Sequence, residues 1–286
     1  MPELPEVETI LRGLKEHTLG ERVAAVEVRN WAVIVGSADH FVQGITGSRI
    51  VGFARKGKVL AIRLARRNRA LRHLLVRLGM TGQFTVSRRE SPIAPHTHVR
   101  LVLGRGKEEL RFRDVRRFGR LRCCTRRELE EVFSHLGPDA REISEEQFLV
   151  ALRGRRGAVK SWLMNQQFIS GIGNIYADEA LFAARIHPLT PAGRLTPLSA
   201  RRLRRAVRKV LDRAVALGGT SVRDYLNAEG RPGNFLSQLR VYQRTGEPCR
   251  RCRRSIRRLA ISGRSTHFCP RCQPRPRRVT VKPGRR

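Results

Sequence analysis

The hydrophobic and polar positions follow one period in the first half of the chain and another in the second. In residues 7–14 (VETILRGL), apolar side chains recur every three or four positions, which predicts a short amphipathic helix. Residues 22–124 mostly alternate with a period of two, as in 59–64 and 99–103, and Gly and short polar clusters separate these runs. This part of the chain is therefore predicted to form a β-sandwich or flattened barrel.

The period becomes helical after residues 136–139 (LGPD). Residues 158–167 predict one helix, and the glycine-rich segment 168–173 predicts a turn. Asn174 is placed to cap a second helix over residues 175–184. The second half is thus predicted to be largely helical.

One further helix and a long loop complete this half. The pair Thr196-Pro197 is a favourable start for a helix, and Gly218-Gly219 is a favourable end. Its basic and apolar residues fall largely on opposite sides. Residues 220–242 contain several Gly and Pro and predict a long loop, and loops of this length are often functional.

The charge of the chain indicates what kind of partner it binds. The 286 residues carry a formal net charge of +35, from 59 Lys and Arg against 24 Asp and Glu. Such an excess indicates a polyanionic partner, with nucleic acid favoured over a ribosomal or merely basic-tailed protein. The sequence contains neither a secretory signal nor an apolar run of eighteen residues, so we expect no membrane segment.

Four cysteines near the C-terminus have the spacing of a metal site. Cys249 and Cys252 form one Cys-x-x-Cys pair, Cys269 and Cys272 form another, and sixteen residues separate the pairs. This arrangement predicts a tetrahedral, structural Zn²⁺ site with no open position. It does not resemble a secreted disulfide framework, so we expect a reducing, intracellular setting.

Short motifs along the chain match a known family in sequence and in order. They are residues 2–9 (PELPEVET), 78–82 (LGMTG), 116–119 (RRFG), 171–177 (GIGNIYA), 218–220 (GGT) and the four-cysteine segment. Together they span roughly residues 2–273, and the chain resembles bacterial formamidopyrimidine-DNA glycosylase. The resemblance implies a DNA-formamidopyrimidine glycosylase that is also a DNA-(apurinic or apyrimidinic site) lyase, acting on duplex DNA in base-excision repair.

The resemblance also implies an α+β architecture. It comprises an N-terminal catalytic β-sandwich domain with a leading helix, a helix-two-turns-helix DNA-binding domain with a lesion-capping loop, a four-cysteine zinc finger and a basic disordered tail. The expected boundaries are 1–132, 133–240, 241–273 and 274–286.

The N-terminal motif implies the chemistry. Once Met1 is removed, Pro2 presents a secondary amine, and an α-amino group with a pKa of about 8 is partly neutral at pH 7. Attack on the sugar C1′ expels an oxidised purine, 8-oxoguanine or a formamidopyrimidine, and leaves a Schiff base that permits β,δ-elimination. By resemblance Glu3 is the acid/base partner and Glu6 supports it.

A base inside a duplex must be flipped out before it can react. The resemblance assigns Met80, Arg116 and Phe118 to filling the gap and pairing with the orphaned base. On composition alone Met80 and Phe118 would be core residues. The neighbouring Gly79 and Gly119 favour exposed turns instead.

Phosphate contacts complete the predicted site. The resemblance assigns Lys58 and Arg264 to the catalytic group, as phosphate-binding residues, and Asn174 to a phosphate at a helix N-terminus. Lys58 and Arg264 could each be an ordinary solvated cation instead. Lys160 is the weaker candidate for a contact near the lesion or the DNA backbone.

Two positions depart from the family pattern. Arg77 stands before the LGM motif where the family typically has His, and we expect altered pH dependence from it. Val115 stands where the family has Pro, so the loop that carries Arg116 is expected to be less rigid.

Three other functions compete with this interpretation. An enzyme resembling endonuclease VIII would prefer oxidised pyrimidines, but Leu4, Val7 and residues 218–220 favour the purine-directed branch. A non-catalytic DNA lesion-binding protein would not need Pro2, Glu3 and Lys58. A ribosome-associated zinc protein does not account for the N-terminal motif. We expect a cytoplasmic, nucleoid-associated bacterial monomer.

Overall fold

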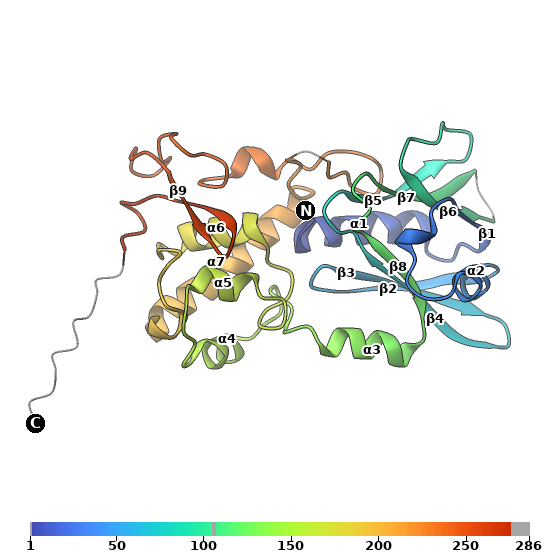
Figure 1. Cartoon of the computed structure of the whole chain (residues 1–286), viewed down its shortest axis with the longest axis horizontal. Coiled ribbons are helices and arrows are strands. Elements are labelled where there is room, and N and C mark those ends of the chain that lie inside the picture. Colours follow the sequence, from blue (N-terminus) through green and yellow to red (C-terminus); the bar gives the residue numbers. More distant parts are fainter. Residues whose placement is uncertain (1, 105–106, 223, 276–286) are drawn as a thin grey trace, which may run out of the picture. The chain divides into compact units, whose positions relative to one another are not determined.

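The chain forms two compact units in a computed structural model that describes residues 2–104, 107–222 and 224–275 (Figure 1). The first unit comprises Met1–Glu142, Gln166–Ile172 and Leu211–Gln238. The second comprises Ile143–Asn165, Gly173–Val210 and Leu239–Arg286. From residue 276 onward the predicted basic tail lies outside the described residues. Within the described ranges, every helix is too short or too polar to cross a membrane.

The first unit contains two four-stranded antiparallel sheets, with strand orders β1-β6-β7-β5 and β2-β3-β4-β8. Its strands are β1 (Val23–Val28), β2 (Arg49–Lys56), β3 (Val59–Arg66), β4 (Arg69–Arg77), β5 (Gly82–Arg88), β6 (Thr97–Leu103), β7 (Glu108–Asp114) and β8 (Arg120–Cys124). Its helical elements are α1 (Leu4–Thr18), η1 (Trp31–Val33), α2 (Ala38–Ile45), α3 (Arg126–Ser134) and η3 (Phe235–Gln238).

Strand β3 shows how alternation builds the sandwich. Leu60, Ile62 and Leu64 are buried in one core together with apolar residues of both sheets and of α1. On the opposite face of β3, Val59 and Ala61 pack in a second cluster that includes Leu129 of α3. The prediction of a β-sandwich is therefore confirmed, because both faces of this strand are covered.

Helix α2 lies inside the segment that was predicted to be mostly strands. It begins after Ser37, whose hydroxyl accepts the His40 N–H, and it buries Phe41 and Ile45. Its apolar residues Ala38, Phe41, Val42 and Ile45 recur at helical spacing, so the sequence carried a helical signal that the prediction of strands passed over.

The second unit is helical and ends in a hairpin. Its elements are α4 (Glu145–Leu152), α5 (Val159–Met164), α6 (Asn174–Ala183), η2 (Ala192–Arg194), β9 (Arg257–Ile261) and β10 (Arg264–Phe268). Helix α7 (Pro197–Ala216) begins in this unit and ends in the first.

Two helix boundaries differ from the prediction. Helix α5 ends at Met164 rather than 167, because Asn165 has extended backbone angles. Helix α6 is capped by Gly173, and Asn174 is its first residue. The predicted loop 220–242 contains η3 and a β-bridge between Thr220 and Asn234, so this loop has local structure of its own.

The sandwich core predicts a contrast between two phenylalanines. Phe84 is completely buried and contacts Phe112 edge-to-face, whereas Phe118 is 52% exposed. We expect Phe84→Ala to lower the free energy of unfolding by about 3–5 kcal/mol, because it leaves a cavity. Phe118→Ala, the matched control, should change it by less than about 1 kcal/mol. Urea unfolding of both variants measures the difference; equal losses would contradict the assigned core.

Candidate functional site

The carboxylate of Glu6 connects the N-terminus of the chain to a distant loop. Pro2 and Glu3 are buried immediately before α1. Glu6 Oε2 accepts the Glu3 N–H at 2.7 Å, and Glu6 Oε1 accepts the Thr220 N–H at 2.7 Å. One buried side chain therefore fixes the backbone beside Pro2 and the start of the predicted capping loop.

The glycine and tyrosine of this loop contact the same glutamate. Gly219 has φ +85°, and a Cβ there would lie 2.9 Å from Glu6 Oε1, so both the conformation and the space favour glycine. The Tyr225 hydroxyl donates to the Glu6 carbonyl at 3.4 Å. Burial and the nearby Glu6 charge raise the pKa of Tyr225, so its hydroxyl remains a donor at neutral pH.

The glycine-rich turn before α6 is packed against the start of α1. The Leu4 N–H donates to the Gly171 carbonyl at 3.0 Å. Gly171 has φ +108°, and a Cβ on it would approach the Leu4 side chain to 2.5 Å. The motif GIG is thus needed for close packing behind Pro2 and Glu3.

Lys58 lies half-buried in the turn between β2 and β3. Arg55 and Asp139 hold this turn in place. Asp139 Oδ2 accepts hydrogen bonds from Arg55 Nη1 at 2.5 Å and from the Gly57 N–H at 3.0 Å. Arg55 Nε also donates to Glu8 at 2.8 Å. Sequence analysis noted Asp139 only as a domain boundary and missed its role here.

Burial and charge pairing oppose each other in this cluster. Burial alone would raise the pKa of Glu8, but its hydrogen bonds to Arg55 and Arg12 more than offset this and lower it. Burial alone would lower the pKa of Arg55, but Asp139 and Glu8 raise it. Glu8 and Arg55 therefore both carry their charges at neutral pH.

Asp114 joins the two loops that carry Met80 and Arg116. Asp114 Oδ1 accepts the Thr81 hydroxyl at 2.5 Å, and Oδ2 accepts the Gly119 N–H at 2.7 Å. The Arg116 N–H donates to the Thr81 hydroxyl oxygen at 3.1 Å. These bonds hold the loop in place although Val115 stands where the family pattern has proline.

The side chains on these loops reach solvent. Met80 is 39% exposed and Phe118 is 52% exposed, so both are surface residues rather than core residues. The Arg116 guanidinium lies 4.7 Å from the centre of the Phe118 ring, a cation–π contact. The first unit thus presents a thioether, an aromatic ring and a cation together.

Lys160 does not lie on the surface. Its side chain is 0% exposed, and Nζ lies 2.7 Å from Asp178 Oδ1 and 2.8 Å from the Thr266 hydroxyl. Asp178 Oδ2 also accepts the backbone N–H of His267 at 2.8 Å. The sequence-based assignment of Lys160 to a direct DNA contact therefore has no geometric support; Lys160 instead joins α5 to α6 and the hairpin.

The adjacent Glu179 has a similar structural role. It is 3% exposed, and its carboxylate accepts the backbone N–H groups of residues 240–242 at 2.9–3.0 Å. Both Asp178 and Glu179 lie within the helix that the sequence predicted, but the sequence had no signal for these long-range bonds.

Asn174 and Arg264 line one open hollow of about 640 Å³ in the second unit. Arg264 is exposed at the first position of β10, after the tight turn Ser262-Gly263, where both residues have positive φ. Asn174 Oδ1 is buried and lacks a hydrogen-bond partner within the described ranges. The hollow thus combines the N-terminus of α6 with the exposed cation of Arg264, which suits a phosphate.

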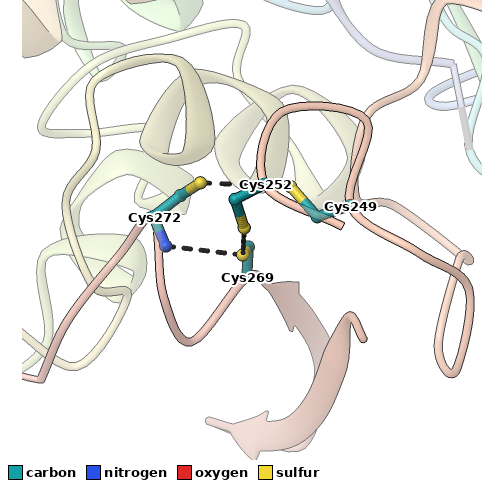
Figure 2. A group of neighbouring side chains, drawn as sticks. All are labelled: Cys249, Cys252, Cys269 and Cys272. Atoms are coloured by element: carbon teal, nitrogen blue, oxygen red, sulfur yellow. Dashed lines mark hydrogen bonds between the residues drawn. The ribbon is translucent and has the colours of Figure 1, made fainter. Parts of the chain in front are cut away.

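The four C-terminal cysteines converge (Figure 2). Their sulfur atoms all lie within 4.8 Å of one another, with Cys252 and Cys269 at 3.4 Å and Cys249 and Cys272 at 4.0 Å. Tetrahedral thiolates at a Zn–S distance of about 2.3 Å are roughly 3.8 Å apart, so the set fits one structural zinc ion. The prediction of a structural zinc site is confirmed.

The other two cysteines are unsuited to metal binding. Cys123 and Cys124 are buried in β8, and burial raises the pKa of both thiols to about 11. They are therefore protonated and unreactive at neutral pH.

Comparison with known protein families covers most of the chain. A formamidopyrimidine-DNA glycosylase N-terminal domain model matches residues 1–121, and the corresponding H2TH domain model matches residues 136–225. A zinc-finger model, described as found in FPG and IleRS, matches residues 246–275.

Individual relatives agree over nearly their full lengths. A formamidopyrimidine-DNA glycosylase of Solibacter usitatus is 43% identical, covering 96% of this chain and 100% of that protein. One of Salinispora arenicola is 42% identical, covering 99% and 100%. A variant Lactococcus lactis FPG, solved with DNA containing Fapy-dG, matches with a TM-score of 0.89 and 31% identity over 96% of this chain and all of that chain. The Lactococcus lactis Fpg solved with DNA containing an abasic site has a TM-score of 0.88 at 31% identity, with the same coverage.

Zinc removal should disrupt the hairpin selectively. The segment 249–272 has a small core of its own, so metal binding supplies much of its folding free energy. We expect one zinc ion per chain, and we expect chelation to unfold β9–β10 while the sandwich remains folded. Colorimetric zinc release and hydrogen exchange measure this. Zinc-independent protection of residues 257–268 would contradict it.

From the Glu8–Arg55 pair we expect the first unit to lose stability at acid pH. Because the pKa of Glu8 is lowered in the folded state, its contribution is complete above the unfolded value of 4.5 and is lost as the pH falls through the lowered one. The free energy of unfolding can be measured through Trp31 fluorescence in a Trp162→Phe background. Between pH 5 and 3 it should fall more steeply than in the same background with Glu8→Gln. Parallel curves would show that the pair contributes nothing.

Proposed function

Because this chain belongs to the formamidopyrimidine-DNA glycosylase family, we propose that it removes oxidised purines from duplex DNA and cleaves the strand with its N-terminal proline as nucleophile. The observation that carries this proposal is the placement of Pro2, buried and held by the Glu3–Glu6–Thr220 bonds. The chemistry needs removal of Met1, which lies outside the described residues.

Pro2 supplies the reaction with a secondary amine. Its nitrogen lone pair forms a bond to C1′ as the N-glycosidic bond breaks, and the base leaves with the bonding electrons and takes up a proton. The nitrogen then loses its proton, and its lone pair expels the ring oxygen O4′, which takes up a proton as the C1′–O4′ bond breaks and the sugar opens. The iminium ion formed in this way acidifies the proton on C2′. Loss of that proton expels the 3′ phosphate, and a second elimination expels the 5′ phosphate. Glu3, adjacent to Pro2, is proposed to transfer the protons, and Glu6 to position Glu3.

The surface residues are proposed to hold DNA. Met80 and Phe118 are exposed apolar side chains that could replace a flipped base in the stack, and Arg116 could hydrogen-bond its partner. Lys58, at the turn that Arg55 and Asp139 fix, and Arg264, at the hairpin turn, are proposed to bind the phosphates flanking the lesion. These roles are supported by the exposure of the apolar side chains and by the positive charge of the arginines and the lysine.

The second unit positions its own DNA contacts through buried polar bonds. Asn174 is proposed to bind a phosphate at the start of α6. Lys160 is proposed to act indirectly: by pairing with Asp178 and Thr266, it fixes the hairpin that presents Arg264. The zinc ion, held by the four cysteines, stabilises the same hairpin and takes no part in the reaction.

Substrate preference is the second part of the proposal. Lactococcus lactis Fpg has been solved with Fapy-dG DNA and, in another complex, with DNA containing an oxidised pyrimidine. We propose that oxidised purines are the preferred substrates and that the activity on oxidised pyrimidines is weaker. The protein would then differ from endonuclease VIII in which of the two lesion classes it prefers. We also propose that the protein acts as a monomer on chromosomal DNA in the bacterial cytoplasm.

Borohydride trapping tests the nucleophile. The chain is incubated with a duplex carrying one 8-oxoguanine opposite cytosine, and the iminium ion is reduced to a stable protein–DNA bond. We expect a covalent band and a nicked strand from the native chain, and loss of the band in an N-terminally extended form that blocks the amine. Pro2→Gly, which replaces the secondary amine with a primary amine, should trap more slowly.

Three outcomes separate the alternatives. Tight binding without a band or a nick would identify a lesion-binding protein. A band formed only with an oxidised-pyrimidine duplex would identify the endonuclease VIII-like activity. A band retained by the N-terminally extended form would move the nucleophile from Pro2 to another amine, and peptide mapping of the adduct would find it.

A further inference from the structure

The cavity between α2 and the β3–β4 hairpin has a chemistry that the proposed reaction does not use. It has a volume of about 320 Å³ and lies within the first unit. Its lining residues are His40, Gln43, Gly44, Ser48, Leu64, Arg66, Arg69, Ala70 and Arg72. This lining includes three arginines and no Asp or Glu.

The three arginines are brought together by the hairpin register. Arg66 at the end of β3 pairs directly with Arg69 at the start of β4, across a turn in which Asn68 has φ +58°. Like charges opposite each other destabilise a strand pair, so the arrangement carries an electrostatic cost. Within the described ranges, no ion pair to Arg66, Arg69 or Arg72 offsets that cost, although other arginines of the same unit, such as Arg55 and Arg100, are paired with carboxylates.

The opposite wall of the cavity offers polar groups on well-packed elements. Helix α2 contributes His40 and Gln43, and Ser48 follows it with 2% exposure. Arg66 Nη1 donates to the carbonyl of Thr46, the C-cap residue of α2, at 3.2 Å. Because a guanidinium has five N–H donors, this bond orients Arg66 and uses only part of its capacity.

The cavity is remote from the residues assigned to the lesion. Lys58 precedes β3 and Met80 follows β4, whereas Arg66 and Arg69 lie at the other ends of these two strands. Strand β3 has eight residues, which corresponds to roughly 25 Å at about 3.3 Å per residue. A ligand in the cavity therefore does not compete with a base at Pro2.

We propose that this cavity, formed by Arg66, Arg69 and Arg72 with His40, Gln43 and Ser48, is a second phosphate-binding site of the protein. Guanidinium groups match phosphate oxygens in geometry and charge, and the polar side chains of the facing wall complete a recess rather than a flat basic surface. The phosphate groups belong either to the backbone of a second DNA segment or to a small polyphosphate.

Two probes and two matched variants test the site. The cavity variant carries Arg66→Ala, Arg69→Ala and Arg72→Ala. The control carries Arg88→Ala, Arg89→Ala and Arg127→Ala, which removes three exposed positive charges elsewhere in the same unit. The first probe is inorganic tripolyphosphate, titrated calorimetrically into the zinc-loaded chain. The second is an undamaged, labelled duplex added to protein already trapped covalently on a lesion duplex, so that the first DNA-binding site is occupied.

We expect the cavity variant to bind at least one of the two probes about tenfold more weakly, and the control to change by less than about twofold. Weakening for the second duplex, with a salt slope reduced by about 2–3, identifies DNA as the source of the phosphates. Weakening for tripolyphosphate alone identifies a small polyphosphate. Equal losses in the two variants, or no loss in either, would overturn the proposal.

The test of the cavity is independent of the proposed reaction. The tripolyphosphate titration requires no catalytic activity, so it stands even if no covalent adduct forms with lesion DNA. Strand cleavage should be the same in both variants, because neither set of residues belongs to the lesion site. Far-ultraviolet circular dichroism confirms that each variant is folded.

Discussion

The first unit depends on one carboxylate that satisfies two distant backbone donors. Glu6 accepts the N–H of Glu3 through one oxygen and that of Thr220 through the other. A buried carboxylate is costly unless its lone pairs are satisfied, so this residue orders both segments or neither. The first residues of a domain are normally its most mobile part, and here a buried hydrogen bond holds the backbone of Glu3, next to Pro2.

The same solution recurs wherever a functional loop leaves a sheet or helix. Asp114 holds the loop of Arg116 and Phe118, Asp139 holds the turn of Lys58, and Asp178 holds the hairpin of Arg264. In each case a residue proposed to contact DNA lies on a segment that a buried acid holds by hydrogen bonds. In this strongly basic chain, these three carboxylates therefore have structural roles.

The sequence predicted the parts whose signal is local. Alternation in β3 and the two Cys-x-x-Cys pairs each specify a structure over a few residues, and the sandwich and the zinc site follow from them. Lys160 shows the limit of such inference: a lysine is expected at the surface, and only the fold brings Asp178 and Thr266 to it. The roles of Asp139 and Glu179 were likewise invisible, because their partners lie far away in sequence.

The Glu6–Thr220 bond also has a consequence for the order of biosynthesis. Glu6 is translated long before Thr220, which lies 214 positions further along the chain. The Thr220 N–H therefore becomes available to Glu6 only after a long stretch of further synthesis. Until then the Glu6 carboxylate lacks one of the two backbone donors that it binds in the folded chain.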